Sequence, residues 1–345
     1  MQHTHLIRTL IVTALAIWVG GPVLGQSFYK DAQAPFEITI HDEDLHDPER
    51  GRDVPVKVYA PVGAEGPRPV VLISHGLGGS REGLSYLGKF WASHGYVCIV
   101  IQHVGSDDSI WRDVPARERL SAMRQAVTEP KHAINRTGDV TFVIDTLEAG
   151  NGEDDGPLHG DYDLDKLAIA GHSFGAWTCL AAGGMTLGSN TNLGDERIKC
   201  MIPLSSPAQS RPGLRDRTYG SIRIPALHMT GTLDTSVITN MPAEDRRIPY
   251  DHTPGPADHG ASQYLVIFDG ADHMTFGGET GRTNRRLSRV SDQANAGFHK
   301  VILHSGLAFL DANLFGDDAA QQWLNGAGFL GVVEPVGTLE RKLAQ

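Results

Sequence analysis

Cysteine is scarce in this sequence of 345 residues, which contains only Cys98, Cys179 and Cys200. Three cysteines, each inside an apolar run, do not make the framework of a disulfide-stabilised fold. We expect three buried free thiols, and a bridge between Cys179 and Cys200 is the alternative. None of the three is placed as a nucleophile.

An excess of basic residues is also lacking, because 30 Lys and Arg stand against 41 Asp and Glu, a formal net charge of −11. A negative charge of this size argues against nucleic acid and against anionic membranes as partners. Internal repeats and Ser- or Pro-rich linkers are absent as well. We therefore expect one catalytic domain over residues 26–345, in which residues 318–345 form a peripheral C-terminal segment.

The longest apolar run lies near the N-terminus, where Arg8 precedes residues 9–19 and small residues follow. This order predicts a signal peptide over residues 1–25, and hence a secreted or periplasmic protein. A transmembrane anchor is the alternative, but the run is short for a bilayer and a Gly-Gly-Pro sequence at residues 20–22 breaks it. No cysteine follows the run, so we do not expect a lipid anchor.

The most informative stretch is residues 167–180, with the sequence LAIAGHSFGAWTCL. An apolar strand and a helix-forming run flank G-H-S-F-G at residues 171–175, which fits the G-x-S-x-G pattern of a nucleophile elbow. Glycines let such a sharp turn close around a strained serine. We expect the Ser173 hydroxyl to project at the N-terminus of the helix, where unpaired N–H groups can stabilise an oxyanion.

Strands and helices alternate along the rest of the chain, which predicts an α/β fold with a mostly parallel central sheet and helices on both faces. The expected strands are residues 36–40, 54–59, 70–73, 96–101, 167–170, 198–204, 224–229 and 264–268, with a polar turn over 42–53. The expected helices are residues 81–94, 139–147, 176–182 and 292–313, followed by a short helix and a weakly ordered tail after residue 318. Residues 107–130 are expected to form a helical rim, and residues 236–262 an irregular excursion beside the site.

A glycine-rich turn, S-H-G-L-G-G-S at residues 74–80, directly follows one of the expected central strands. Such a turn lets backbone N–H groups approach a ligand, and in α/β-hydrolases it supplies the second oxyanion donor. We expect the N–H groups of Leu77 and Phe174 to form the oxyanion hole, and His75 to brace the turn. A phosphate-binding loop is the alternative, but no Gly-Lys-Ser/Thr follows and no dinucleotide fingerprint fits.

A serine hydroxyl is a poor nucleophile at neutral pH, so Ser173 requires a base and an orienting carboxylate. The α/β-hydrolase order is Ser, then Asp or Glu, then His, each at the end of a strand. Asp234 and His273 follow the last two expected strands and fit this order. Asp272 and Asp269 are alternatives for the acid.

The other histidines are expected to serve elsewhere. His172 adjoins the nucleophile, and we expect its side chain to point away from the site and to pack. His252 and His259 fall in the irregular excursion and are expected in solvent or at the rim. Alternating aspartates at residues 161–165 suggest a calcium loop, but its glycine and glutamate are missing, so a solvated turn is expected.

The motifs S-H-G-L-G-G-S-R (residues 74–81) and G-H-S-F-G (171–175) resemble the α/β-hydrolase branch of secreted platelet-activating-factor acetylhydrolases and bacterial predicted dienelactone hydrolases. The segments V-P-V-K-V-Y-A-P and D-V-T-F-V-I-D-T-L are also similar to that branch, and the resemblance spans roughly residues 36–312. It implies Ser173, Asp234 and His273 as the triad. Two departures stand out. Trp177 places a bulky ring near the acyl pocket, where it faces either the core beneath the elbow or the pocket wall, and the nucleophile is serine where true dienelactone hydrolases have cysteine.

These features predict a serine carboxylic-ester hydrolase that works through an acyl-enzyme, without metal or cofactor, on short-acyl esters such as acetylated phospholipid-like ones. A polyester or aromatic-ester hydrolase of the same fold is the alternative. A catalytically silent binding protein and an acyltransferase are further hypotheses, because a fold does not determine a function.

Overall fold

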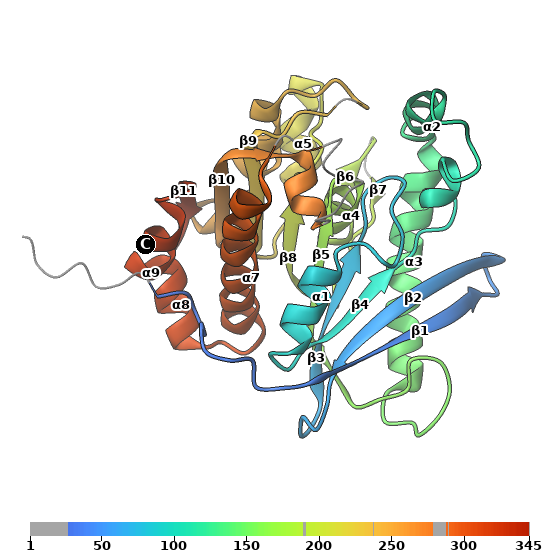
Figure 1. The fold of residues 1–345 in the computed structure, drawn as a ribbon, viewed down its shortest axis with the longest axis horizontal. Coiled ribbons are helices and arrows are strands. Elements are labelled where there is room, and N and C mark those ends of the chain that lie inside the picture. Colours follow the sequence, from blue (N-terminus) through green and yellow to red (C-terminus); the bar gives the residue numbers. More distant parts are fainter. Residues whose placement is uncertain (1–26, 189–190, 237, 279–287, 289, 345) are drawn as a thin grey trace, which may run out of the picture.

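A nine-stranded sheet, in the order β1-β2-β4-β3-β5-β8-β9-β10-β11, forms the centre of the computed structural model, which describes residues 27–188, 191–236, 238–278, 288 and 290–344 (Figure 1). The strands are β1 (Ile38–Asp47), β2 (Arg52–Pro61), β3 (Arg68–Ser74), β4 (Val97–Ile101), β5 (Tyr162–His172), β8 (Ile198–Leu204), β9 (Ala226–Leu233), β10 (Gln263–Asp272) and β11 (Gly337–Lys342). All pairs from β4 to β10 are parallel, while β1, β2 and β11 pair antiparallel at the edges. The predicted α/β-hydrolase fold is confirmed. The predicted signal peptide lies outside the described residues.

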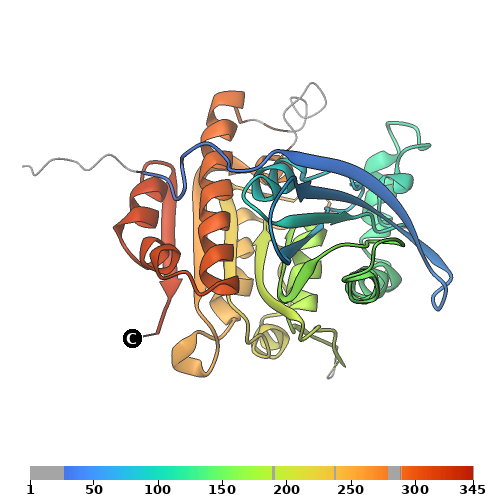
Figure 2. The same ribbon diagram turned by 90° about the horizontal axis from the view of Figure 1, so that it is seen from below.

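Helices cover both faces of this sheet, as Figures 1 and 2 show from two directions. The α-helices are α1 (Ser85–Ala92), α2 (Arg119–Ala126), α3 (Pro130–Gly150), α4 (Phe174–Ala182), α5 (Arg215–Tyr219), α6 (Ile248–His252), α7 (Asp292–Leu314), α8 (Asp318–Asn325) and α9 (Ala327–Val333). Short 3-10 helices are η1 (Asp108–Ile110), η2 (Pro212–Leu214), η3 (Ala243–Arg247), η4 (Pro256–Asp258) and η5 (His273–Gly277), and β6 (Thr186–Leu187) pairs with β7 (Thr191–Asn192).

Two apolar clusters fill the space between the sheet and its helices. Val71 and Ile73 of β3 point into the cluster shared with α1, α7, α8 and α9, while Val70 and Leu72 point into the cluster shared with α3, α4, α5 and α6. Successive side chains of a strand alternate between faces, so a strand buried on both sides must be apolar throughout. This is why the central strands are uninterrupted apolar runs in the sequence.

The three cysteines are buried and free, which confirms the prediction. Cys179 belongs to the cluster under α3 and α4, whereas Cys200 belongs to the cluster under α1 and α7. The sheet therefore separates the two thiols, and the alternative of a bridge between them is wrong.

Two edges of the sheet differ from the prediction. The turn expected over residues 42–53 is wrong, because β1 continues to Asp47 and β2 already begins at Arg52. Edge strands can be polar because one face meets solvent, so their charged residues look like a turn in the sequence. The weakly ordered tail is also wrong, since Leu339 of β11 pairs with Val266 of β10 and packs on the core.

Helix α3 is longer than expected, since it begins at Pro130 rather than at Asp139. A proline fits the first helical position because its missing N–H has no partner there anyway. Within the described ranges, no helix is both long and apolar enough to cross a bilayer.

Candidate active site

The turn between β5 and α4 holds Ser173 in a strained backbone conformation, with φ of 57° and ψ of −116°. Few residues other than glycine adopt a positive φ, so the surroundings must enforce it. A Cβ on Gly175 would overlap the carbonyl oxygen of Ser74, and a Cβ on Gly171 would lie 2.5 Å from the Gly175 carbonyl oxygen. Both glycines of the motif are therefore required for the turn to sit against β3.

The structure brings the three residues proposed for a triad into one hydrogen-bonded chain. His273 Nε2 lies 3.0 Å from Ser173 Oγ, and His273 Nδ1 lies 2.8 Å from Asp234 Oδ1. The side chains come from the C-terminal ends of β5, β9 and β10, which are parallel and so end at the same edge of the sheet. Because Nδ1 faces a carboxylate, it carries the proton, and Nε2 is left free to accept one from the serine.

Asp234 is fully buried, and burial alone would raise the pKa of its carboxyl. Donors on every side reverse this effect: His273, the Arg246 guanidinium, the Ser205 hydroxyl at 2.9 Å and the Thr230 hydroxyl at 2.8 Å. Together they lower the pKa of Asp234 to about 2. The carboxylate is therefore ionised at neutral pH, as an orienting acid must be.

The two alternative acids are engaged elsewhere. Asp272 accepts hydrogen bonds from the backbone N–H groups of Met274 and Thr275, and thus caps the 3-10 helix η5. Asp269 is exposed and accepts from the Thr232 hydroxyl at 3.2 Å. Neither carboxylate contacts the His273 ring in this arrangement.

His172 does not point away from the site, so that prediction is wrong. Its ring lies 4.7 Å from the His273 ring between centroids, and its Nε2 lies 3.0 Å from the His273 carbonyl oxygen. Burial is the main cause that lowers the pKa of His172 well below its usual range. The neutral ring therefore donates from Nε2 and holds the His273 loop. Strand alternation fails as a guide here because the chain turns sharply at Ser173.

The glycine-rich turn after β3 lies against the nucleophile. A Cβ built on Gly76 would lie 3.4 Å from the Cβ of Ser173. His75 braces the turn as predicted, since its Nδ1 lies 2.6 Å from the Gly76 carbonyl oxygen and its Nε2 accepts from the His103 N–H. Among the described residues, we find no acceptor for the N–H groups of Leu77 and Phe174.

Arg136 of α3 is a buried residue of this site that our reading of the sequence missed. It donates to the His75 carbonyl oxygen at 2.7 Å and to Ser106 Oγ at 2.8 Å. Its guanidinium carbon lies 4.3 Å from the centroid of the Phe174 ring. One cation therefore contacts both segments that carry the candidate oxyanion donors. No motif marks it, because α3 precedes β5 in the sequence and meets the turn only in the fold.

Two tryptophans border the site. Trp111, which follows η1, donates from its indole N–H to the Gly78 carbonyl oxygen at 2.7 Å, so the predicted rim rests on the glycine-rich turn. Trp177 is half-buried, packs on the apolar cluster beneath α4, and lies 5.6 Å from the Phe174 ring between centroids.

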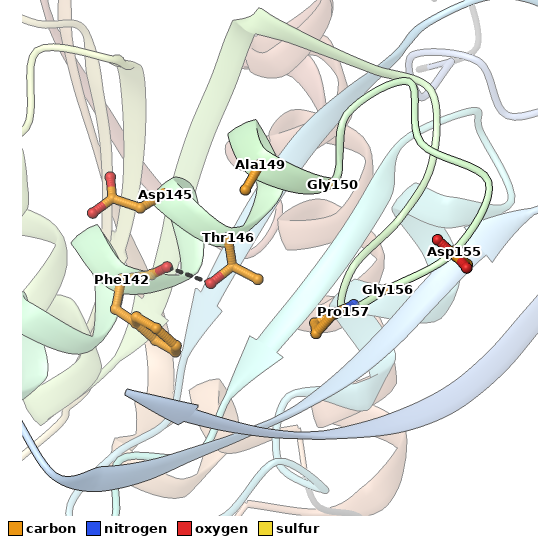
Figure 3. A pocket seen from close by; sticks show the side chains of 8 residues that line it. All are labelled: Phe142, Asp145, Thr146, Ala149, Gly150, Asp155, Gly156 and Pro157. Carbon is orange, nitrogen blue, oxygen red and sulfur yellow. Dashed lines mark hydrogen bonds between the residues drawn. The ribbon is translucent and has the colours of Figure 1, made fainter. Parts of the chain in front are cut away.

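A separate hollow of about 350 Å³ lies between the C-terminal part of α3 and the loop at residues 155–157 (Figure 3). It is lined by the start of the segment that leads into β5, whereas Ser173 follows the other end of that strand. The hollow is therefore distinct from the site around Ser173. The part of the chain that the structure describes contains no group of three or more His, Cys, Asp or Glu side chains that could hold a metal ion.

A mostly parallel sheet with a serine on an elbow, and an aspartate and a histidine after two later strands, defines an α/β-hydrolase fold with a Ser-His-Asp site. A family model described as "Platelet-activating factor acetylhydrolase, isoform II" matches residues 51–125, which include the glycine-rich turn. This match supports the platelet-activating-factor acetylhydrolase branch on which the resemblance was based.

Two curated relatives are similar in sequence. The platelet-activating factor acetylhydrolase of Cavia porcellus is 29% identical over 180 residues, and that of Bos taurus is 31% identical over 168 residues. The alignments cover 44% and 40% of this chain. They cover only 38% and 35% of the two relatives, so the chain matches less than two fifths of either one's length. The predicted resemblance to the platelet-activating-factor acetylhydrolase branch is confirmed.

Proposed function

We propose that the protein is a serine hydrolase of carboxylic esters, with Ser173 as nucleophile, His273 as general base and Asp234 as the orienting acid. The observation that carries the proposal is the continuous contact from Asp234 Oδ1 to His273 Nδ1 at 2.8 Å and from His273 Nε2 to Ser173 Oγ at 3.0 Å. A carboxylate that stays ionised, a histidine with a free Nε2 and a serine on an elbow are the parts that acyl transfer requires.

The mechanism follows from this geometry. Ser173 Oγ attacks the ester carbonyl carbon while its proton passes to His273 Nε2, and the N–H groups of Leu77 and Phe174 stabilise the oxyanion. The C–O bond to the alcohol then breaks as the imidazolium gives its proton to the departing oxygen, which leaves an acyl-enzyme. Water, deprotonated by the same imidazole, releases the acid and restores Ser173. No step in this sequence requires a metal or a cofactor.

We propose short-acyl esters, including acetylated phospholipid-like ones, as the substrate class. The support is the match of residues 51–125 to the platelet-activating factor acetylhydrolase model, together with the similarity to two platelet-activating factor acetylhydrolases. The half-buried Trp177 beside Phe174 is a bulky group close to the oxyanion donor. We also propose export, with residues 1–25 as a signal peptide and residues 26–345 as one catalytic domain.

The test compares wild type with Ser173→Ala, using p-nitrophenyl esters from C2 to C12 and a fluorophosphonate label. We expect the variant to lose both hydrolysis and labelling, while its thermal midpoint stays close to that of wild type. The matched control is Ser121→Ala, which removes an exposed hydroxyl on α2. Activity or labelling retained by Ser173→Ala would show that another residue is the nucleophile.

The same assay separates the other hypotheses. A folded wild-type protein that neither hydrolyses any ester nor takes the label would favour a binding protein. Capture of the acyl group by added alcohols faster than by water would indicate an acyltransferase. A preference for aromatic or polymeric esters over short-acyl ones would contradict the proposed substrate class while leaving the triad intact.

A further inference from the structure

The segment between β9 and β10 contains the helices η3, α6 and η4 where the sequence predicts an irregular excursion, and it brings a buried arginine to the proposed triad. Arg246, at the end region of η3, is only 3% exposed. Its Nη2 lies 3.2 Å from His273 Nδ1, and its Nε lies 3.2 Å from Asp234 Oδ1. The cation therefore contacts both the acid and the base.

The same guanidinium also donates hydrogen bonds to two backbone carbonyl groups, one of Asp234 itself and one of Ser205, which follows β8. Its Nη1 donates to the Ser205 carbonyl oxygen at 2.9 Å, and its Nε donates to the Asp234 carbonyl oxygen at 3.1 Å. Ser205 itself has a positive φ of 57°, a conformation that needs enforcement outside glycine. Its hydroxyl lies 2.7 Å from His273 Nδ1. Arg246 thus fixes the orientation of the groups that hold the imidazole.

The charges that face His273 come from a small set of neighbours. Asp234 after β9 is the one carboxylate in contact with the ring, Arg246 is the one cation, and His172 of β5 is neutral because burial lowers its pKa. Ser173 and Ser205 contribute hydroxyl groups. The Asp272 carboxylate is turned toward the N–H groups of η5. These statements concern the residues that the structure describes.

We propose that Arg246 is a positioning residue whose charge keeps the His273 imidazole unprotonated, and therefore able to accept the serine proton, at more acidic pH than a Ser-His-Asp triad alone. The proposal rests on the proposed esterase function. In a typical triad the lone carboxylate favours the imidazolium, because an opposite charge stabilises the protonated form. Here the guanidinium shares that carboxylate and repels a second positive charge placed 3.2 Å away. The fall of activity on the acid side of the pH profile, the acid limb, should therefore occur at lower pH than in such a triad.

The test is the pH dependence of two quantities, kcat/KM for p-nitrophenyl acetate and the rate of labelling by a fluorophosphonate. The variants are Arg246→Gln and Arg246→Met, which remove the charge, and Arg246→Lys, which keeps it. The matched control is Arg247→Gln, because Arg247 is the next residue but pairs on the surface with Asp251 and Glu340. The position of a pH limb does not depend on how much of a sample is active, so a partly folded variant is still informative.

We expect the acid limb of both neutral variants to move to higher pH by about 1 to 3 units, the range for one charge within contact distance. Arg246→Lys should lower kcat, because the planar fork to Ser205 and Asp234 is lost, while its limb stays near that of wild type. Arg247→Gln should leave both the limb and kcat unchanged.

Two results would overturn the inference. One is a limb that stays in place when the charge is removed, and the other is a limb that moves as far in Arg246→Lys as in Arg246→Gln. If neither neutral variant folds, the lysine variant decides alone, since an upward shift of its limb contradicts the proposal. Wild-type protein that is neither labelled nor active would instead refute the proposed function, so the two failures are distinguishable.

Discussion

Acid should destabilise this protein, because burial keeps several histidines neutral in the folded state. Among them are His75, His103, His172 and His228, and burial is the main cause that lowers the pKa of each one. For His103 this effect outweighs the Asp139 carboxylate, which lies 3.0 Å from its Nδ1. The pKa falls to about 4 for His103 and to about 3 for His228. All four are therefore neutral in the native protein at pH values where an unfolded chain, with a histidine pKa of about 6.5, is already protonated.

The sign and size follow from proton linkage. Each folded-state pKa lies below the unfolded value, so the unfolded chain binds more protons and the free energy of unfolding falls as pH drops below about 6.5. One histidine contributes about 1.4 kcal/mol per pH unit in the range between its two pKa values. Between about pH 6.5 and pH 5, His103 and His228 alone would remove roughly 4 kcal/mol, which is a large part of the 5–15 kcal/mol that a typical domain has in total. Asp234, with a pKa of about 2, adds a further loss only at lower pH.

Urea titrations followed by tryptophan fluorescence, at several pH values from about 7.5 to 5 and constant ionic strength, would measure this slope. The matched variant is His228→Gln, because His228 lies in β9 against Tyr250 and does not contact the triad. We expect this substitution to reduce the slope by about one proton. A free energy of unfolding that is constant or increases as pH falls would refute the reasoning.

Two substitutions test the site more directly. Asp234→Asn should lower kcat by roughly 10⁴ without loss of folded protein, because the amide cannot hold the correct tautomer of His273; a near-normal Asp234→Asn beside an inactive Asp269→Asn would reassign the acid. Trp177→Ala should raise the kcat/KM ratio of C8 to C2 esters and cost about 2 kcal/mol of unfolding free energy, against about 3–5 kcal/mol for the fully buried Trp91→Ala. An unchanged ratio would show that the Trp177 ring does not line the acyl pocket.

The sequence predicts those elements whose structure is determined by a local pattern of residues. The strand expected over residues 198–204 coincides with β8, because an apolar run of that length is typical of a buried strand in an α/β fold. The elbow could be predicted because sterics at Gly171 and Gly175 leave little choice of residue. By contrast, β11 could not, because a polar edge strand is defined by its partner β10 rather than by its own residues.

The residues that sequence analysis missed share a physical cause. Arg136 and Arg246 belong to no motif, and each acts through contacts with segments far along the chain, Ser106 in one case and Ser205 in the other. A buried cation is costly unless several acceptors converge on it. The acceptors come together only in the folded protein, so the sequence alone does not show that these two arginines are buried.

The two arginines lie beside the two places where charge develops in the proposed reaction. Arg136 lies behind the turn that would bind the oxyanion, where negative charge develops as Ser173 attacks. Arg246 lies behind the imidazole, where positive charge develops in the same step. Arg136 would therefore favour the tetrahedral intermediate, whereas Arg246 would oppose the imidazolium.

The effect of Arg246 on His273 is twofold. The imidazole becomes a weaker base toward Ser173, but the imidazolium becomes a stronger acid toward the departing alcohol oxygen. An alkoxide is a poor leaving group that gains most from such protonation, whereas p-nitrophenolate needs little. The loss in Arg246→Gln at a pH above both acid limbs should therefore be greater for alkyl acetates than for p-nitrophenyl acetate, which is the outcome that a purely structural role for Arg246 does not produce.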